Sequence, residues 1–257
     1  MNDASPDSQE LLLSGTRLPV TASVVFVEAS VERIVENLDR GVRGNFLRSE
    51  WGSGYTSTKL PGVPLARALD ALLPLTTPMP RRRLLVPTAN PRWTAVFDGS
   101  PAIADQGGFA TWLQVGGLRS LVLVDMPETH NRQTRMGIFA YRAAFWRIPN
   151  AENRPLAWSR IVAKNETGRW EYEASPDWPL AAEGDSSASR VQYRLTRDHL
   201  RALAAELDLH PYDENFYDSF AGATLITEPG RWEREREWEW AEVRSTIMAE
   251  GEPIRDK

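Results

Sequence analysis

Two carboxylates and an imidazole lie close together in a polar stretch of the chain at residues 125–130. Asp125, Glu128 and His130 offer oxygen and nitrogen ligands for a divalent ion, and His130 is also a possible general base. Asp98, at the end of a predicted strand, is a further candidate acid. The spacing D-x-x-E-x-H matches no established ligand pattern, and polar loops are usually solvated. We therefore interpret the stretch as a solvated loop and keep a hydrolase-type site as the alternative.

The glycine-rich stretches lack the order that serine or nucleotide chemistry requires. Residues 51–55 read Trp-Gly-Ser-Gly-Tyr, which does not satisfy G-x-S-x-G, and no apolar strand precedes them. The glycine pairs at 107–108 and 116–117 form neither G-x-G-x-x-G nor a phosphate loop. With 3 His and no Cys, the chain also lacks a recognised metal-ligand spacing. The sequence therefore predicts no cofactor and no metal.

Two arginine-containing stretches can be interpreted either as binding surfaces or as parts that pack within the chain. The run Arg81-Arg82-Arg83 can contact phosphate, but we expect it in solvent at a sheet edge, where charge blocks unwanted strand pairing. In the C-terminal stretch 232–240, glutamates alternate with Arg or Trp. Trp and Arg anchor interfaces, although such a stripe also serves packing within one chain. If this stretch is a strand, one face carries the candidate partner-binding residues Trp232, Arg234, Arg236, Trp238 and Trp240.

Composition places the chain among ordinary globular proteins. It has 257 residues, 42% of them hydrophobic, and a formal net charge of -5. The acidic balance disfavours a nucleic-acid surface. The polar N-terminus lacks the pattern of a secretory signal, and no apolar run approaches the roughly 20 residues that span a bilayer. We therefore expect a cytoplasmic protein that contacts neither nucleic acid nor membrane.

The hydrophobic pattern predicts an α+β fold with a mostly antiparallel or mixed sheet built from hairpins, and with several packed helices. Helices are expected after Ser30, Pro64 and Thr196, the first ending at Gly41. Residues 44–62 and 125–135 are expected to be loops. Strands are predicted at 21–28, 84–86, 93–97, 118–124, 137–145, 156–163, 169–173 and, as the last one, 223–227.

The same pattern divides the chain into three parts. Residues 1–18 are expected to be a loose leader, 19–228 a single domain and 229–257 a C-terminal appendage. We expect the domain core to include Trp93, Phe97, Phe109 and Trp112, which lie on the apolar faces of a predicted strand and a predicted helix.

Four segments in a fixed order carry a family resemblance: residues 93–98, 168–173, 193–196 at the start of a helix, and 215–217. Over roughly residues 80–228, this order resembles a group of uncharacterised bacterial proteins. The resemblance implies no activity. Some such proteins look like immunity proteins of contact-dependent toxin systems, so the resemblance implies a toxin-neutralising role as one possibility.

Taken together, these patterns favour a non-enzymatic protein that binds a protein partner or associates with itself. The acidic balance, the 10 Trp and the lack of a catalytic constellation fit this hypothesis. The alternative is a hydrolase that uses Asp98, Asp125, Glu128 or His130.

Overall fold

A computed structural model describes residues 11–43, 54–101, 106–127, 140–147, 158–165, 168–182, 184–228 and 235–246 of the chain. Their strands are β1 (Ser23–Val27), β2 (Thr56–Lys59), β3 (Leu75–Thr77), β4 (Arg82–Pro87), β5 (Thr94–Asp98), β6 (Ser120–Met126), β7 (Tyr141–Arg147), β8 (Trp158–Asn165), β9 (Trp170–Ala174), β10 (Thr224–Thr227) and β11 (Arg236–Trp238). The α-helices are α1 (Val31–Arg43), α2 (Leu65–Leu69), α3 (Gln106–Val115), α4 (Arg197–Ala205) and α5 (Trp240–Thr246). Short 3-10 turns are η1 (Leu12–Gly15), η2 (Val20–Ala22), η3 (Asp70–Leu72), η4 (Val191–Tyr193), η5 (Glu214–Phe216) and η6 (Ser219–Ala221).

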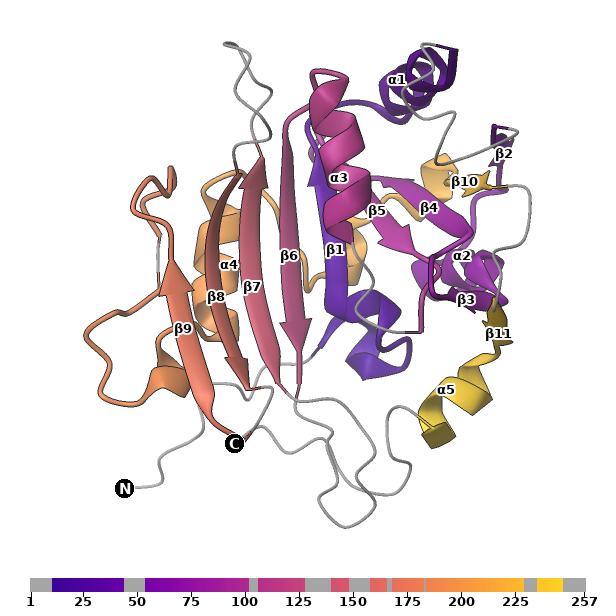
Figure 1. Ribbon diagram of the computed structural model, residues 1–257. Helices are drawn as coiled ribbons and strands as arrows, with labels where there is room; N and C mark the ends of the chain where they lie inside the picture. The colour runs from indigo at the N-terminus through magenta and orange to yellow at the C-terminus, as the bar shows by residue number, and fades with distance from the viewer. Residues whose placement is uncertain are drawn as a thin grey trace.

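Nine of the described strands form one sheet in the order β2-β10-β4-β5-β1-β6-β7-β8-β9, and β11 pairs with β3 in a separate ribbon. All pairings among the described residues are antiparallel. Helices α3 and α4 lie on opposite sides of the sheet (Figure 1). The predicted α+β class with an antiparallel sheet is therefore confirmed.

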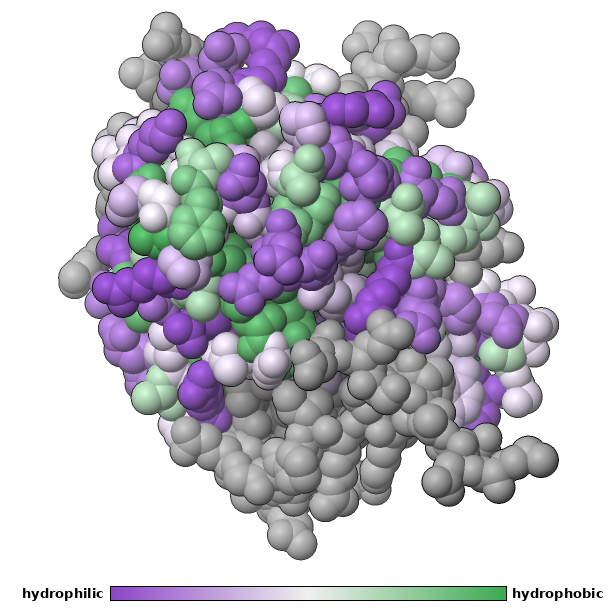
Figure 2. Space-filling model, turned by 180° about the vertical axis from the view of Figure 1, so that it is seen from behind, coloured by the Kyte–Doolittle hydropathy of each residue, from purple (hydrophilic) through white to green (hydrophobic). Residues whose placement is uncertain are grey.

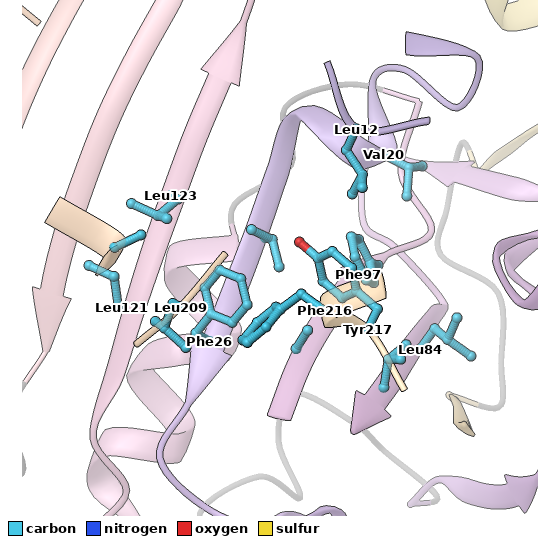
Figure 3. Packing of buried hydrophobic residues seen from close by; sticks show 14 of the residues in the cluster. Leu12, Val20, Phe26, Leu84, Phe97, Leu121, Leu123, Leu209, Phe216 and Tyr217 are labelled. Atoms are coloured by element: carbon cyan, nitrogen blue, oxygen red, sulfur yellow. The ribbon is translucent and has the colours of Figure 1, made fainter. Parts of the chain in front are cut away.

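The central strands are buried on both faces because helices and turns cover each side. In β1, Phe26 belongs to the cluster that includes α4, whereas Val25 and Val27 pack with α1 and α3. Figure 3 shows Phe26 close to Phe97, Phe216 and Tyr217, and the ring centroids of Phe97 and Tyr217 lie 5.5 Å apart. A strand enclosed in this way needs apolar side chains at successive positions, which explains the run Val24–Val27.

Several local expectations are confirmed. The hairpins β4–β5 and β8–β9 pair as predicted. The side chain of Thr196 accepts a hydrogen bond from the backbone N–H of His199 and caps α4. Trp93, Phe97 and Phe109 are buried. The side chain of Trp112 lies outside the described part of the chain.

Other expectations differ from the structure at element boundaries. Helix α1 continues past Gly41 to Arg43, and the expected loop 44–62 contains the exposed edge strand β2. Of the expected leader, residues 1–10 lie outside the described residues, while Leu12 and Leu18 are buried against the rest of the chain. Apolar residues in a turn carry no periodic signal, so the pattern did not reveal this packing.

The C-terminal segment packs onto the domain through the ribbon β3–β11, which adds a strand after the expected last one. Trp238 and Val243 are buried in the main core cluster. The guanidinium of Arg17 lies 5.4 Å from the ring centroid of Trp240, so this segment also contacts the N-terminal turns.

Candidate functional site

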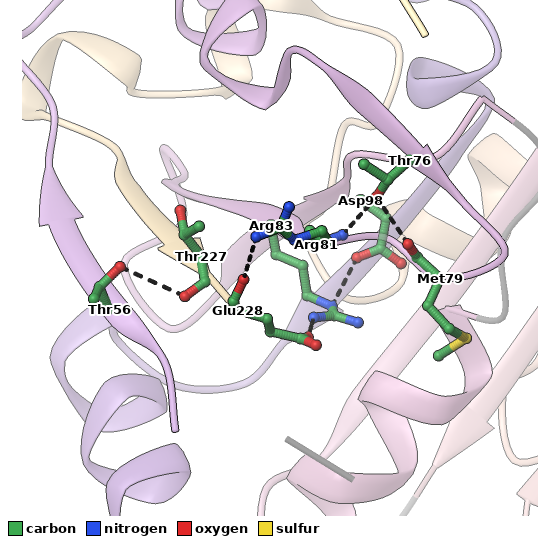
Figure 4. A network of polar contacts seen from close by, with 8 residues as sticks. All are labelled: Thr56, Thr76, Met79, Arg81, Arg83, Asp98, Thr227 and Glu228. Carbon is green, nitrogen blue, oxygen red and sulfur yellow. Dashed lines mark hydrogen bonds and ion pairs between the residues drawn. The ribbon is translucent and has the colours of Figure 1, made fainter. Parts of the chain in front are cut away.

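Asp98 lies in a buried ion-pair cluster at the end of β5 (Figure 4). The Nε atom of Arg83 is 3.1 Å from Oδ1 of Asp98, and Nη1 of the same arginine donates to Glu228. Above the guanidinium, the ring centroid of Phe109 is 4.8 Å away. The cluster thus joins β4, β5 and the end of β10. Asp98 is a member of an ion pair between strands rather than an acid facing solvent.

The position of Arg83 corrects the expectation for the arginine run. Strand β4 lies between β10 and β5, so Arg83 is in the interior of the sheet and almost fully buried rather than at a solvated edge. Arg81, at the margin of the cluster, donates from Nη1 to Oε1 of Glu235 at 3.2 Å. Sequence alone did not predict this because the strand was expected to begin after Arg83, and because Glu228 lies 145 positions away. Burial raises the pKa of Glu228, and Arg83 opposes that rise.

Asp125 is also buried, and it belongs to β6 rather than to the expected loop 125–135. Its Oδ1 lies 3.2 Å from Nε of Arg142 and its Oδ2 lies 2.5 Å from Nε of Arg197. Burial and the neighbouring Asp125 carboxylate raise the pKa of Tyr212. A buried carboxylate requires such partners, which join β6, β7 and the first turn of α4. Glu128 and His130 lie outside the described residues.

Two clefts lined by described residues contain neither Asp98 nor Asp125. One, of about 340 Å³, lies beside the first turn of α1 and includes Glu32, Lys59 and Asp218. The other, of about 290 Å³, follows the end of α4 and includes Arg201 and Tyr212. Within the described ranges, no group of three His, Asp or Glu residues is placed to hold a metal ion. Neither of the two described candidate acids, Asp98 and Asp125, therefore lines either of these clefts.

The described part of the C-terminal stripe covers its own chain. Nε1 of Trp238 donates to Oγ1 of Thr77 at 3.3 Å, and Nε1 of Trp240 donates to Oδ1 of Asp70 at 3.2 Å. Arg236 is exposed, and its guanidinium stacks 3.6 Å from the ring centroid of Trp238. Trp232 and Arg234 lie outside the described residues. Partner binding by this stripe stays a prediction.

A different surface gathers the residue types that anchor interfaces. It is the side of β7, β8 and β9 opposite α4, and we call it the Trp158 face. Partners in the strand register share this side, with Phe145 opposite Arg160 and Lys164 opposite Glu171. The face carries Phe145, Trp158, Arg160, Val162, Lys164, Glu171 and Glu173, and of these Val162 is buried.

Trp158 is held in place by its neighbours yet remains 41% exposed. Its ring centroid lies 5.4 Å from that of Phe145 and 4.9 Å from the guanidinium of Arg160. A second guanidinium, that of Arg147, is 5.8 Å away and donates to Thr111 of α3. Aromatic and cation–π contacts of this kind restrict the indole before any partner arrives.

The described helices leave the β8 and β9 part of the Trp158 face uncovered. Helix α3 covers β6 and β1, and α4 lies behind β7 and β8 (Figure 1). Helix α3 also reaches the end of β7, where Arg147 donates to Thr111, but no described helix lies over the front of β8 and β9. Seen from behind, hydrophobic and hydrophilic residues are interspersed over the described surface rather than gathered in one broad apolar area (Figure 2).

Sequence reasoning predicted β8 and β9 but missed the Trp158 face. Part of the signal was present, since Trp158, Arg160 and Lys164 alternate with Ser159, Ile161 and Ala163, although the apolar Val162 interrupts the outer row. Alternation of this kind is typical of a strand with one open face. It did not indicate which face the helices would leave uncovered.

Comparisons of the chain with protein-family models, curated proteins and solved structures found no match. The resemblance to uncharacterised bacterial proteins therefore stays a prediction. In the part of the chain that the structure describes, no helix has the length and apolar character needed to cross a membrane.

Proposed function

We propose that this chain is a non-enzymatic protein-binding protein and that it binds through the Trp158 face. The observation that carries the proposal is Trp158 itself, 41% exposed and held by Phe145 and Arg160 on an open sheet surface. Trp and Arg dominate the binding energy of protein interfaces, above all where the anchoring side chain is already ordered.

The charges around Trp158 favour a protein over a nucleic acid. Arg160 is paired with Glu173, from Nε to Oε1 at 2.7 Å, and Nζ of Lys164 lies 3.7 Å from Oε2 of Glu171. Carboxylates along the outer strand oppose the approach of a phosphate backbone, as does the net charge of -5.

The alternative function, a hydrolase, gains no support from the two candidate acids that are described. Asp98 and Asp125 are buried and form ion pairs with arginines. The toxin-neutralising role implied by the family resemblance concerns the identity of a partner, on which none of the described contacts bears, and it stays a prediction.

Site-specific photo-crosslinking tests the proposal. A photoreactive amino acid replaces Lys164, on the Trp158 face, or Phe220, which is 68% exposed on η6. We expect protein adducts from position 164 in cells, absent from position 220 and lost when Trp158→Ala is added. Adducts from 164 that disappear on nuclease treatment, or equal adducts from both positions, would contradict the proposal.

A further inference from the structure

The Trp158 face carries two parallel rows of opposite charge. Strand β8 presents the cations Arg160 and Lys164, and the neighbouring strand β9 presents the carboxylates Glu171 and Glu173. All four side chains are partly or well exposed to solvent. Adjacent strands of any sheet lie about 4.8 Å apart. The two charged rows therefore run side by side at the same spacing as the strands of a second sheet placed over them.

Rows arranged in this way are complementary to themselves. A two-fold axis parallel to the strands, between β8 and β9, places β8 of one copy over β9 of the other. Lys164 then faces Glu171 of the partner subunit, and Arg160 approaches Glu173 of the partner subunit. The same patch on both copies meets itself, as a two-fold contact requires. In other alignments cations face cations, so the rows also select one register.

From this pattern we infer that the partner of the Trp158 face is a second copy of this chain, in a two-fold homodimer with the sheets packed face to face. The inference rests on the proposed function and names the occupant of the same surface. Trp158 of β8 supplies the aromatic contact, Phe145 supports it within its own copy, and the charge rows set the orientation. Only β8 and β9 of each copy overlap about this axis, so the contact area is small and the dimer is concentration-dependent rather than obligate.

Sedimentation equilibrium of the purified full chain over a concentration series tests the dimer. We expect the wild type to dimerise at low ionic strength and to dissociate more readily as salt is added. Trp158→Ala should weaken the dimer at least about tenfold. The matched control is Phe220→Ala, which removes another exposed aromatic side chain, on η6 and outside the Trp158 face. This control should leave the association unchanged.

Charge exchange tests the alignment of the rows. Arg160→Glu places a third carboxylate beside Glu171 and Glu173 and should weaken the dimer several-fold. Arg160→Glu combined with Glu173→Arg restores opposite charges within and between copies, so association should recover. Circular dichroism melting of each variant separates a lost dimer from a lost fold.

Three outcomes would overturn the inference. The first is a wild type that stays monomeric over the whole series. A second is a dimer that neither Trp158→Ala nor Arg160→Glu weakens, since it must use another surface. The third is a chain that sediments as a monomer while position 164 forms a crosslink to a different protein. This last result leaves the proposed function standing, whereas a monomer without any crosslink contradicts both.

Discussion

The two ends of the sheet differ in what covers them, and their strands differ accordingly. Toward β1, β4, β5 and β6, turns and helices pack on both faces, and successive residues of these strands are buried. Toward β8 and β9, one face packs on α4 and η4, and no described helix covers the other. The enclosed strands are apolar at consecutive positions, whereas β9 alternates and β8 is apolar at consecutive positions only over residues 161–163. One sheet thus combines a buried centre with an amphipathic end suited to recognition.

Two tryptophans on adjacent strands make this comparison measurable. Trp146 of β7 points toward α4 and is 5% exposed, while Trp158 of β8 points to the open side and is 41% exposed. They share residue type and neighbouring positions, since Trp146 lies opposite Ser159 and Trp158 lies opposite Arg147. A difference in stability between Trp146→Ala and Trp158→Ala therefore shows how far each face of the sheet is buried.

The largest effect is expected for Trp146→Ala. Removing a buried indole that packs beside Trp93, with ring centroids 6.4 Å apart, should lower the free energy of unfolding by about 3–5 kcal/mol. Urea denaturation followed by circular dichroism measures the loss. Trp146→Phe, which keeps most of the apolar volume, is the control and should cost clearly less. A Trp146→Ala variant as stable as the wild type would mean that the α4 side is not the enclosed one.

A similar effect is expected from Arg83→Met in the ion-pair cluster. The substitution leaves Asp98 and Glu228 buried without the guanidinium that they share, and breaking a buried pair in this way costs about 3–5 kcal/mol. Arg92→Met, which removes the exposed partner of Glu28, is the matched control and should cost less than about 1 kcal/mol. Equal losses in both variants would argue against a buried cluster at β4.

The sequence predicts those features of the fold that depend on residues close together in the chain. The hairpins and the Thr196 cap follow from residues close together in the chain, and they were predicted. The partners of Arg83 are 15 and 145 positions away, and those of Asp125 are 17 and 72 positions away. Asp98 and Arg142 lie opposite these residues in neighbouring strands, but the register of those strands was not predicted, and no local pattern brings Glu228 or Arg197 to them. The Trp158 face was missed for the same reason, because the placement of α3 and α4 decides which face stays open.

A smaller, pH-dependent effect is expected at Glu228. Its pKa is raised above the usual 4.5 because burial disfavours the charged form. The native chain therefore holds this proton more tightly than the unfolded chain. The stabilising contribution of Glu228 is fully present below pH 4.5, and it is lost as the pH rises through the raised pKa of the folded state. Glu228→Gln cannot ionise, so its stability relative to the wild type should increase over that interval.

Glu242→Gln provides a control of opposite sign for the pH experiment. A hydrogen bond from Arg236 lowers the pKa of Glu242, so its stabilising contribution is present above the usual value and is lost as the pH falls through the lowered pKa. Paired urea denaturation curves at several pH values compare the two variants. A difference between Glu228→Gln and the wild type that did not change with pH would contradict a buried, desolvated carboxyl at this position.

The smallest effect on stability is expected for Trp158→Ala, and it sharpens the comparison most. The indole is already partly in water, so its removal forfeits only the contacts with Phe145, Arg147 and Arg160. We expect a loss below about 1 kcal/mol, against several for Trp146→Ala in the same urea experiment. A small loss of stability in Trp158→Ala together with a weakened dimer would assign the indole to the contact between copies rather than to the core. If Trp158→Ala instead destabilised the chain as much as Trp146→Ala, this end of the sheet would be enclosed on both faces, and the face would have no surface left to offer a partner.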